Sequence, residues 1–194
     1  VSSLAAIPFH DRIANALSSY VSYIEKMFWP HYLAVLYPYP ESISLWRIVG
    51  SGLLLLMVSV AVSRMIRSKP YHAVGWLWYL GTLVPVIGIV QVGSQAMADR
   101  YTYVPLIGIF IMITWGISDW VTNRHYRKIG LFIATASILA ILMITSVLQL
   151  KYWSNSIKLL KHAVNITKDN GTAHLNLGVA LAEQNNIDDA VRHY

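Results

Sequence analysis

The sequence predicts an all-α protein: a polytopic bundle of about five transmembrane helices, followed by a small helical module outside the membrane. Three observations support this prediction, namely the composition, a series of long uncharged runs and a helical spacing pattern near the end of the chain. Of the 194 residues, 56% are hydrophobic and only 12% are charged, whereas a soluble domain contains about 25% charged residues. The mean hydropathy is positive, at +0.49. This composition excludes an ordinary soluble enzyme.

Residues 1–152 form the predicted transmembrane domain, because runs without Asp, Glu, Lys or Arg recur along this part of the chain. A helix needs about 20 mainly apolar residues to cross about 30 Å of hydrocarbon. The predicted spans lie at approximately 11–29, 45–66, 72–93, 101–119 and 129–150. The first is the weakest, since it contains Glu25 and Lys26, and an interfacial amphipathic helix is its alternative. In the third, Pro85 and Gly88 indicate either a kinked span or a break that lines a cavity.

Basic residues concentrate in two loops and predict the orientation of the spans. One loop holds Arg64, Arg67 and Lys69, and another holds Arg124, Arg127 and Lys128. Because short cytoplasmic loops collect Lys and Arg, residues 30–44, 95–100 and everything after 151 are expected on the extracytoplasmic side. The net charge of +6 then reflects topology, so membrane lipids are expected as partners and nucleic acid is not.

The tail, residues 153–194, has the spacing of the tetratricopeptide repeat. Two small residues occupy the positions where the two helices of a repeat press together, and large residues fill the positions around them. We predict a half repeat over 153–170 and a partial repeat over 171–194, with a generic amphipathic hairpin as the alternative. The packing residues of this pattern are Leu177, Gly178, Leu181, Ala190 and Tyr194. Because about three repeats are needed for stability, we expect further repeats beyond Tyr194, in an array that binds a protein or peptide.

Two formal glycosylation sequons begin at Asn165 and Asn170. They are relevant only in a eukaryotic protein. We favour the alternative, in which Asn170 and Gly171 supply the bend between two repeats.

The most informative polar stretch is Asp99-Arg100-Tyr101-Thr102-Tyr103, which lies between two apolar runs. Ionisable groups at the edge of a membrane are costly and tend to be functional. Arg100 can bind a phosphate through two parallel hydrogen bonds, and Tyr101 and Tyr103 offer hydroxyl groups and ring faces to a sugar. The alternative is that Asp99 and Arg100 neutralise each other as a loop clamp. The sequence has no cysteine, metal-ligand pairing or nucleotide-binding loop, so neither a metal nor a cofactor is predicted.

This stretch, with the segments around it, resembles a known family. The likeness covers Ala98 to Gly108, Trp76 to Gly88, Tyr37 to Pro40 and the start of the repeats. These motifs resemble the C-terminal membrane part and first repeats of the transmembrane and tetratricopeptide-repeat (TMTC-like) family of protein O-mannosyltransferases and its bacterial relatives. Leu106 stands where the family signature has a serine.

The resemblance implies a GT-C fold and transfer of a sugar from a polyprenyl- or dolichyl-phosphate donor to a protein acceptor held by the repeats. It places Asp99 and Arg100, with Tyr101 and Tyr103, at the phosphate and sugar of the donor. The catalytic acid of this fold lies in the first external loop of the full protein, so we expect no catalytic residue and no activity in these 194 residues alone. The expected location is the bacterial inner membrane with a periplasmic tail, or the ER membrane with a lumenal tail.

Two other functions fit parts of the pattern. A membrane-anchored repeat scaffold would need the spans only as an anchor. A transporter is disfavoured, because no predicted span except the first places a charged residue near the middle of the membrane. It would be favoured by an inverted repeat upstream.

Overall fold

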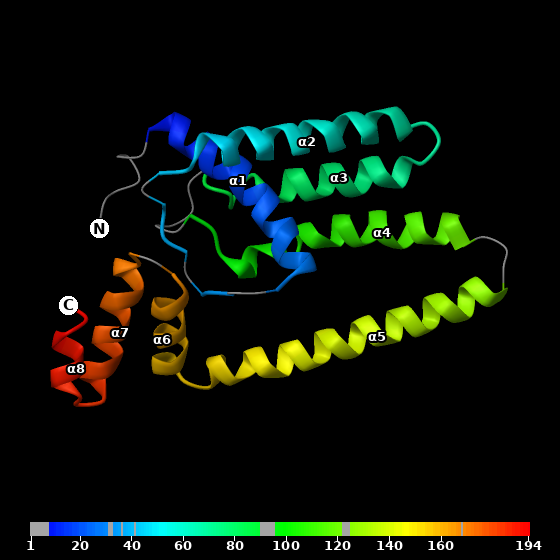
Figure 1. Ribbon diagram of the computed structural model, residues 1–194. Coiled ribbons are helices and arrows are strands. Elements are labelled where there is room, and N and C mark those ends of the chain that lie inside the picture. Colours follow the sequence, from blue (N-terminus) through cyan, green and yellow to red (C-terminus); the bar gives the residue numbers. More distant parts are fainter. Residues whose placement is uncertain are drawn as a thin grey trace. The chain divides into compact units, whose positions relative to one another are not determined.

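The computed structural model describes residues 8–30, 33–35, 37–40, 42–89, 96–121, 125–167 and 169–194. Every regular element within these ranges is helical, which confirms the all-α class (Figure 1). The α-helices are α1 Phe9–Phe28, α2 Leu45–Met65, α3 Pro70–Leu83, α4 Pro105–Val121, α5 His125–Leu150, α6 Ser156–Ile166, α7 Gly171–Glu183 and α8 Ile187–Val191. Two short 3-10 helices are η2 Asp99–Thr102 and η3 Lys151–Ser154.

The chain divides into two compact units, Val1–Thr114 and Trp115–Tyr194. The first contains α1, α2, α3 and most of α4, and the second contains the end of α4 with α5 to α8. The division falls inside α4, close to the middle of the chain.

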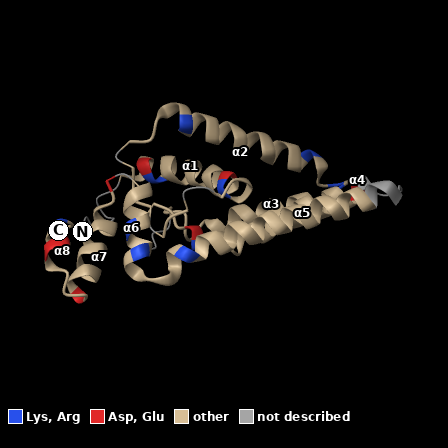
Figure 2. Ribbon diagram, turned by 60° about the horizontal axis from the view of Figure 1, so that its bottom comes forward, with Lys and Arg blue, Asp and Glu red and all other residues tan. Residues whose placement is uncertain are grey.

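Two of the described helices are long and apolar enough to cross a membrane, namely Leu45–Met65 and Ile129–Ser154. A shorter apolar helix covers Pro105–Asp119. The charged residues of α2, Arg47 and Arg64, lie near its start and in its last turn, and Figure 2 shows the blue of basic residues only toward the two ends of this helix. From Ile129 to Leu150 the side chains of α5 are almost wholly exposed, with none of its most apolar window buried. Such surfaces are suited to hydrocarbon, so these two helices indicate a membrane protein.

The other predicted spans differ from the helices that the structure shows. Span 72–93 is interrupted, because α3 ends at Leu83 after 14 residues and a turn follows up to Gly88. Gly88 has a φ of +91°, a left-handed conformation that glycine adopts without a Cβ clash. Residues 90–95 lie outside the described ranges. Span 101–119 begins late, because the chain is 3-10 helical up to Thr102 and α4 starts at Pro105. The count of five spans therefore stays a prediction.

Helix α1, the weakest predicted span, is not among the helices apolar enough to cross a membrane. Its central residues are buried within the first unit, and several of them are polar. The buried residues are Asn15, Ala16, Ser18, Ser19, Tyr20, Ser22 and Tyr23. Polar groups inside a protein require hydrogen-bond partners. The orientation of the buried face of α1 is therefore set by particular polar contacts more than by burial of apolar area.

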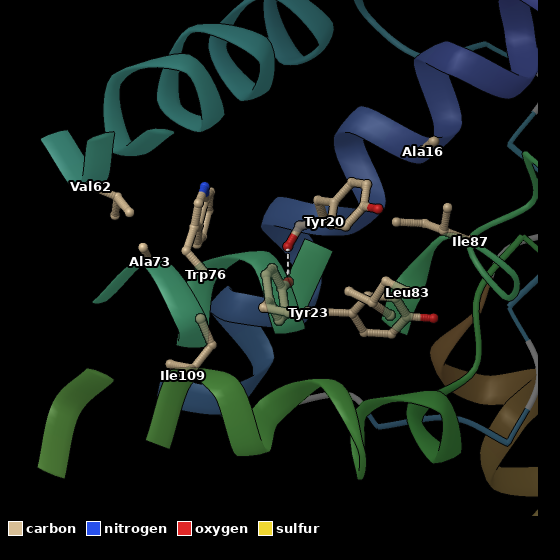
Figure 3. Packing of buried hydrophobic residues seen from close by; sticks show 10 residues of the cluster. Ala16, Tyr20, Tyr23, Val62, Ala73, Trp76, Leu83, Ile87 and Ile109 are labelled. Atoms are coloured by element: carbon tan, nitrogen blue, oxygen red, sulfur yellow. Dashed lines mark hydrogen bonds between the residues drawn. The ribbon is translucent and has the colours of Figure 1, made fainter. Parts of the chain in front are cut away.

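Aromatic residues with polar atoms join α1 to α3 in the core of this unit (Figure 3). The Tyr79 hydroxyl donates to the carbonyl oxygen of Tyr20 at 2.6 Å, and the Tyr20 hydroxyl donates to the carbonyl oxygen of Leu80 at 2.8 Å. Their rings meet edge to face, with centroids 6.0 Å apart. The Trp76 indole donates to Ser59 Oγ at 2.9 Å and so links α3 to α2. These reciprocal bonds satisfy the tyrosine hydroxyls inside an apolar cluster.

Glycines allow α3 and α4 to approach each other closely. A Cβ atom built on Gly75 would lie 2.3 Å from the Gly108 carbonyl oxygen, and one on Gly108 would lie 2.2 Å from the Gly75 carbonyl oxygen. The two backbones thus touch where no side chain intervenes. Small residues at a helix crossing are typical of packing in membranes.

In the second unit, α6, α7 and α8 pack around a small core. Leu177, Leu181 and Ala190 are buried, and α6 adds the partly buried Ile157, Leu160 and Val164. A Cβ on Gly178 would lie 3.3 Å from the Ala190 carbonyl oxygen and 3.4 Å from a ring atom of Tyr194. The residues selected by the repeat pattern therefore lie together between α7 and α8. The assignment of the tail to a repeat array stays a prediction.

We predict that Gly75→Ala destabilises the protein by about 1–3 kcal/mol, because the added methyl group overpacks the crossing with α4. Gly81→Ala in the same helix is the matched control, since a Cβ there has nothing within 4 Å. Thermal unfolding of the intact protein in detergent would measure both effects. Equal unfolding midpoints for the two variants would contradict the close packing at Gly75.

Candidate functional site

The chain leading to Asp99 is an extended segment attached to another loop and to α1. Tyr37 and Met97 form an isolated antiparallel bridge, in which the Ala96 N–H donates to the Tyr37 carbonyl oxygen at 3.0 Å. From α1, Asn15 Nδ2 donates to the Ala96 carbonyl oxygen at 3.2 Å. The two segments that the loop charges place on one side of the membrane are therefore in contact.

Tyr23 of α1 fixes the residue immediately before Asp99. Its hydroxyl accepts a hydrogen bond from the Ala98 N–H at 3.1 Å and donates to the Ala98 carbonyl oxygen at 3.3 Å. Both residues have no exposed surface. Because both backbone groups of Ala98 are paired with one hydroxyl, the start of η2 has a defined position against α1.

Asp99 belongs to a compact polar group that we call the Lys26–Tyr37–Asp99 cluster. The Tyr37 hydroxyl donates to Asp99 Oδ2 at 2.8 Å, and accepts from the Ala34 N–H at 2.7 Å and from Lys26 Nζ. Lys26 Nζ also lies 3.6 Å from Asp99 Oδ1 and 4.0 Å from the centre of the Tyr37 ring. The side chains of Lys26 and Asp99 are only 19% and 26% exposed. The cluster joins α1, the segment at 33–40 and η2.

Burial dominates the ionisation of the cluster. It raises the pKa of Asp99 above its usual value, and the nearby charge of Lys26 and the hydrogen bond from Tyr37 oppose this rise without cancelling it. Burial and the negative charge of Asp99 raise the pKa of Tyr37, which keeps the Tyr37 hydroxyl protonated as a donor. Within the described residues, Asp99 Oδ1 is buried and has no hydrogen-bond partner. Its compensation is the ionic contact with Lys26.

Arg100 behaves differently from its neighbour. It is exposed, and its guanidinium carbon lies 5.3 Å from the centre of the Tyr101 ring. No ion pair between Asp99 and Arg100 occurs in the part of the chain that the structure describes, because the cationic partner of Asp99 is Lys26. The alternative in which the two residues form a loop clamp is therefore wrong. Tyr103 is 79% exposed.

The four residues expected at a donor site thus fall into two groups. Asp99 points into the protein, whereas Arg100 and Tyr103 are exposed and Tyr101 is half-buried beside Arg100. Sequence reasoning missed Lys26 and Tyr37 as members of the site. The available signal was Lys26 itself, because a cation near the end of an apolar run needs a counter-ion. Nothing in the spacing identified Asp99, 73 residues further along, as that counter-ion.

The described residues include no group of three or more histidines and carboxylates that could hold a metal ion. In the second unit, the Nδ1 atoms of His174 and His193 lie 3.0 Å apart. One imidazole must therefore donate to the other. This pair joins α7 to the residues after α8.

Asn170 has a structural role at the start of α7. It is 1% exposed, and its Oδ1 accepts from the Ala173 N–H at 3.0 Å as the N-cap of the helix. Its Nδ2 donates to Thr167 Oγ1 at 2.9 Å. The amide nitrogen that a glycan would need is buried and paired, which supports the turn interpretation of this sequon. Asn165, in contrast, is exposed on α6.

Comparison with known proteins finds a distant similarity to two curated mannosyltransferases. Protein O-mannosyl-transferase TMTC4 from Homo sapiens is 24% identical over 163 residues, which are 81% of this chain and 22% of that protein. Its namesake from Mus musculus is 24% identical over 165 residues, with the same coverage. No family model matches the sequence, and no solved structure matches it. The chain spans about a fifth of the length of these curated relatives.

The relationship is distant but extends over most of the chain. It agrees with the TMTC-like resemblance seen in the motifs. Together with the two apolar helices of membrane-spanning length, it indicates a membrane protein similar to O-mannosyltransferases.

We predict that Asp99 makes folding stability pH-dependent. Its pKa is raised in the folded state from about 3.9 in the unfolded chain, so the folded state binds this proton more tightly. The contribution is fully present below the unfolded pKa and is lost as the pH rises through the folded one. The unfolding midpoint of the intact protein should therefore fall across this window relative to that of Asp99→Asn. Parallel pH profiles for the two proteins would contradict the raised pKa.

Loss of the Asn170 cap should destabilise the start of α7. We predict that Asn170→Ala costs about 1 kcal/mol, because the side chain caps the helix. Amide hydrogen exchange in the intact protein should become faster in the first turn of α7. Asn165→Ala, at an exposed position, is the matched control. Unchanged exchange at Ala173 in Asn170→Ala would show that the cap contributes nothing.

Proposed function

We propose that the intact protein is an integral membrane glycosyltransferase. It transfers a sugar from a polyprenyl- or dolichyl-phosphate donor to an extracytoplasmic protein acceptor. The similarity to Protein O-mannosyl-transferase TMTC4 supports mannose as the sugar and a hydroxyl group as the acceptor. The apolar helices α2 and α5 support a membrane location.

The observation that carries this proposal is that Arg100 is exposed and that an exposed apolar helix, α4, begins five residues after it. An exposed guanidinium group can bind a phosphate with two parallel hydrogen bonds. Directly after it, α4 exposes large apolar side chains, with Ile107 46% and Phe110 51% exposed. A lipid-linked sugar has a phosphate head and a long apolar tail. An exposed cation followed closely in the chain by an exposed apolar helix matches both parts of such a donor.

The chemistry assigns Arg100 to the leaving group. In the transfer, the bond between the sugar C1 and the phosphate oxygen breaks, and a bond from C1 to the acceptor oxygen forms. The released lipid phosphate gains negative charge, while the acceptor hydroxyl loses its proton to a base. Arg100 would stabilise the developing charge electrostatically. Asp99 is unsuited to act as the base, because its carboxylate is held by Tyr37 and Lys26. We place the base in a part of the intact protein outside these residues.

The helices of the second unit would hold the protein acceptor. Both α7 and α8 expose apolar side chains, among them Leu175 and Val191. Such positions are available for stacking of further repeats or for binding a peptide. A membrane-anchored scaffold would use the same surfaces without needing Arg100, so variants of Arg100 separate the two functions.

We predict that Arg100→Ala lowers sugar transfer on the order of 10²-fold, the usual cost of removing one electrostatic stabiliser. Arg100→Lys should retain part of the activity, because it keeps the charge but loses the two-pronged geometry. The assay is transfer of labelled mannose from polyprenyl-phosphate mannose by the intact protein in detergent. Arg64→Ala, which removes an exposed arginine at the end of α2, is the control. Full activity of Arg100→Ala would remove the basis of the proposed function.

A further inference from the structure

Asp99 and Arg100 are adjacent in the chain, yet within the described residues they do not pair with each other. A carboxylate beside an arginine ordinarily competes with a phosphate for the same guanidinium group, and it repels the phosphate as well. In this protein Asp99 is directed into the protein and Arg100 is exposed. Something must therefore hold the carboxylate away and compensate its charge.

One face of α1 performs this task. Asn15, Tyr23 and Lys26 are spaced by eight and three residues, which brings them within about 80° of each other on a helix of 3.6 residues per turn. Asn15 bonds Ala96, Tyr23 bonds Ala98 and Lys26 faces Asp99. The three side chains thus attach consecutive parts of the segment that leads to Arg100.

The second support comes from Tyr37. Its carbonyl oxygen accepts from the Ala96 N–H, and its hydroxyl donates to Asp99 Oδ2. Asp99 Oδ1 is left with Lys26 at 3.6 Å as its compensation. Without Lys26, the buried carboxylate would have no cation from α1, and Arg100 is the next residue in the chain.

We propose that Lys26 is a positioning residue for anion binding: it neutralises Asp99 inside the Lys26–Tyr37–Asp99 cluster and so leaves the charge of Arg100 available to the phosphate of a lipid-linked donor. This inference rests on the proposed function, and it states that Lys26 affects how tightly the protein binds the donor phosphate. Lys26 does not touch the donor. Its effect is transmitted through Asp99.

The proposal makes a prediction that a purely structural role does not. At a pH high enough to keep Asp99 ionised, Lys26→Met leaves an unbalanced carboxylate next to Arg100, so binding of the donor phosphate should weaken. Lys26→Met combined with Asp99→Asn removes both charges, so binding should recover. If Lys26 only stabilised the fold, the double variant would be as impaired as Lys26→Met or worse.

The test uses the intact protein in detergent micelles and two measurements. One is the affinity for polyprenyl monophosphate without a sugar, and the other is the KM and kcat for polyprenyl-phosphate mannose. We expect Lys26→Met to raise Kd and KM about tenfold, equivalent to about 1.4 kcal/mol, with a smaller change in kcat. Lys161→Met removes an exposed lysine of α6 and should change neither value. In an Arg100→Ala background, Lys26→Met should have no further effect on Kd, as coupling between the two residues requires.

Two results would overturn the inference about Lys26. One is a double variant that binds the donor phosphate no better than Lys26→Met. The other is an unchanged Kd in Lys26→Met when Arg100→Ala weakens binding. The proposed function survives both results. An Arg100→Ala protein that binds polyprenyl monophosphate like the wild type overturns the proposed function itself. If Lys26→Met does not fold, the test uses the charge-conserving Lys26→Arg and the double variant. Wild-type affinity for polyprenyl monophosphate in these two variants supports the inference, and a raised Kd in the folded double variant overturns it.

Discussion

A buried carboxylate needs hydrogen-bond donors or a cation to offset its lost hydration, and Asp99 meets this need with Tyr37 and Lys26. The two partners lie 62 and 73 residues before Asp99 in the sequence, so the contact joins three segments of the chain. The ionic contact therefore also fixes where the segment at 33–40 and the helix η2 meet α1. The bonds of Tyr23 to Ala98 and of Asn15 to Ala96 extend the same attachment. Asn15, Tyr23 and Lys26 are the polar residues of α1 that take part in this attachment.

Helix packing in the first unit also depends on specific polar contacts and on close backbone approach. The α1–α3 contact relies on tyrosine hydroxyls that bond backbone carbonyl oxygens, and the α3–α4 contact relies on the absence of side chains at Gly75 and Gly108. In hydrocarbon, burial of apolar area offers little net gain, so hydrogen bonds and close backbone contacts are the interactions that distinguish one helix arrangement from another. The exposed apolar surfaces of α2 and α5 are consistent with such a solvent.

The separation of Asp99 from Arg100 links this architecture to the proposed chemistry. A cation can bind a phosphate strongly only when it is not already paired with a nearer anion. Directing the carboxylate inward, against Lys26, leaves an exposed arginine in η2, shortly before the apolar helix α4. The donor that we propose, a sugar carried on a lipid phosphate, has the phosphate group that such an arginine can bind.

The sequence by itself determined the helical class, the two apolar helices of membrane length and the polar stretch that holds Arg100. These depend on local composition and spacing, which are readable residue by residue. It also selected Leu177, Gly178, Leu181 and Ala190 as neighbours, because a repeat pattern fixes their positions along two adjacent helices. For the third run, the sequence left open whether the span is kinked or broken around Pro85 and Gly88, and the structure shows that α3 ends at Leu83. The late start of α4 was not predicted, since an uncharged run shows apolar character without showing where the backbone turns. The tertiary structure alone decided that Asp99 pairs with Lys26 and Tyr37 instead of Arg100. Residues 62 and 73 positions away in the chain can neutralise a carboxylate only after folding has brought them together, and no local pattern encodes that meeting.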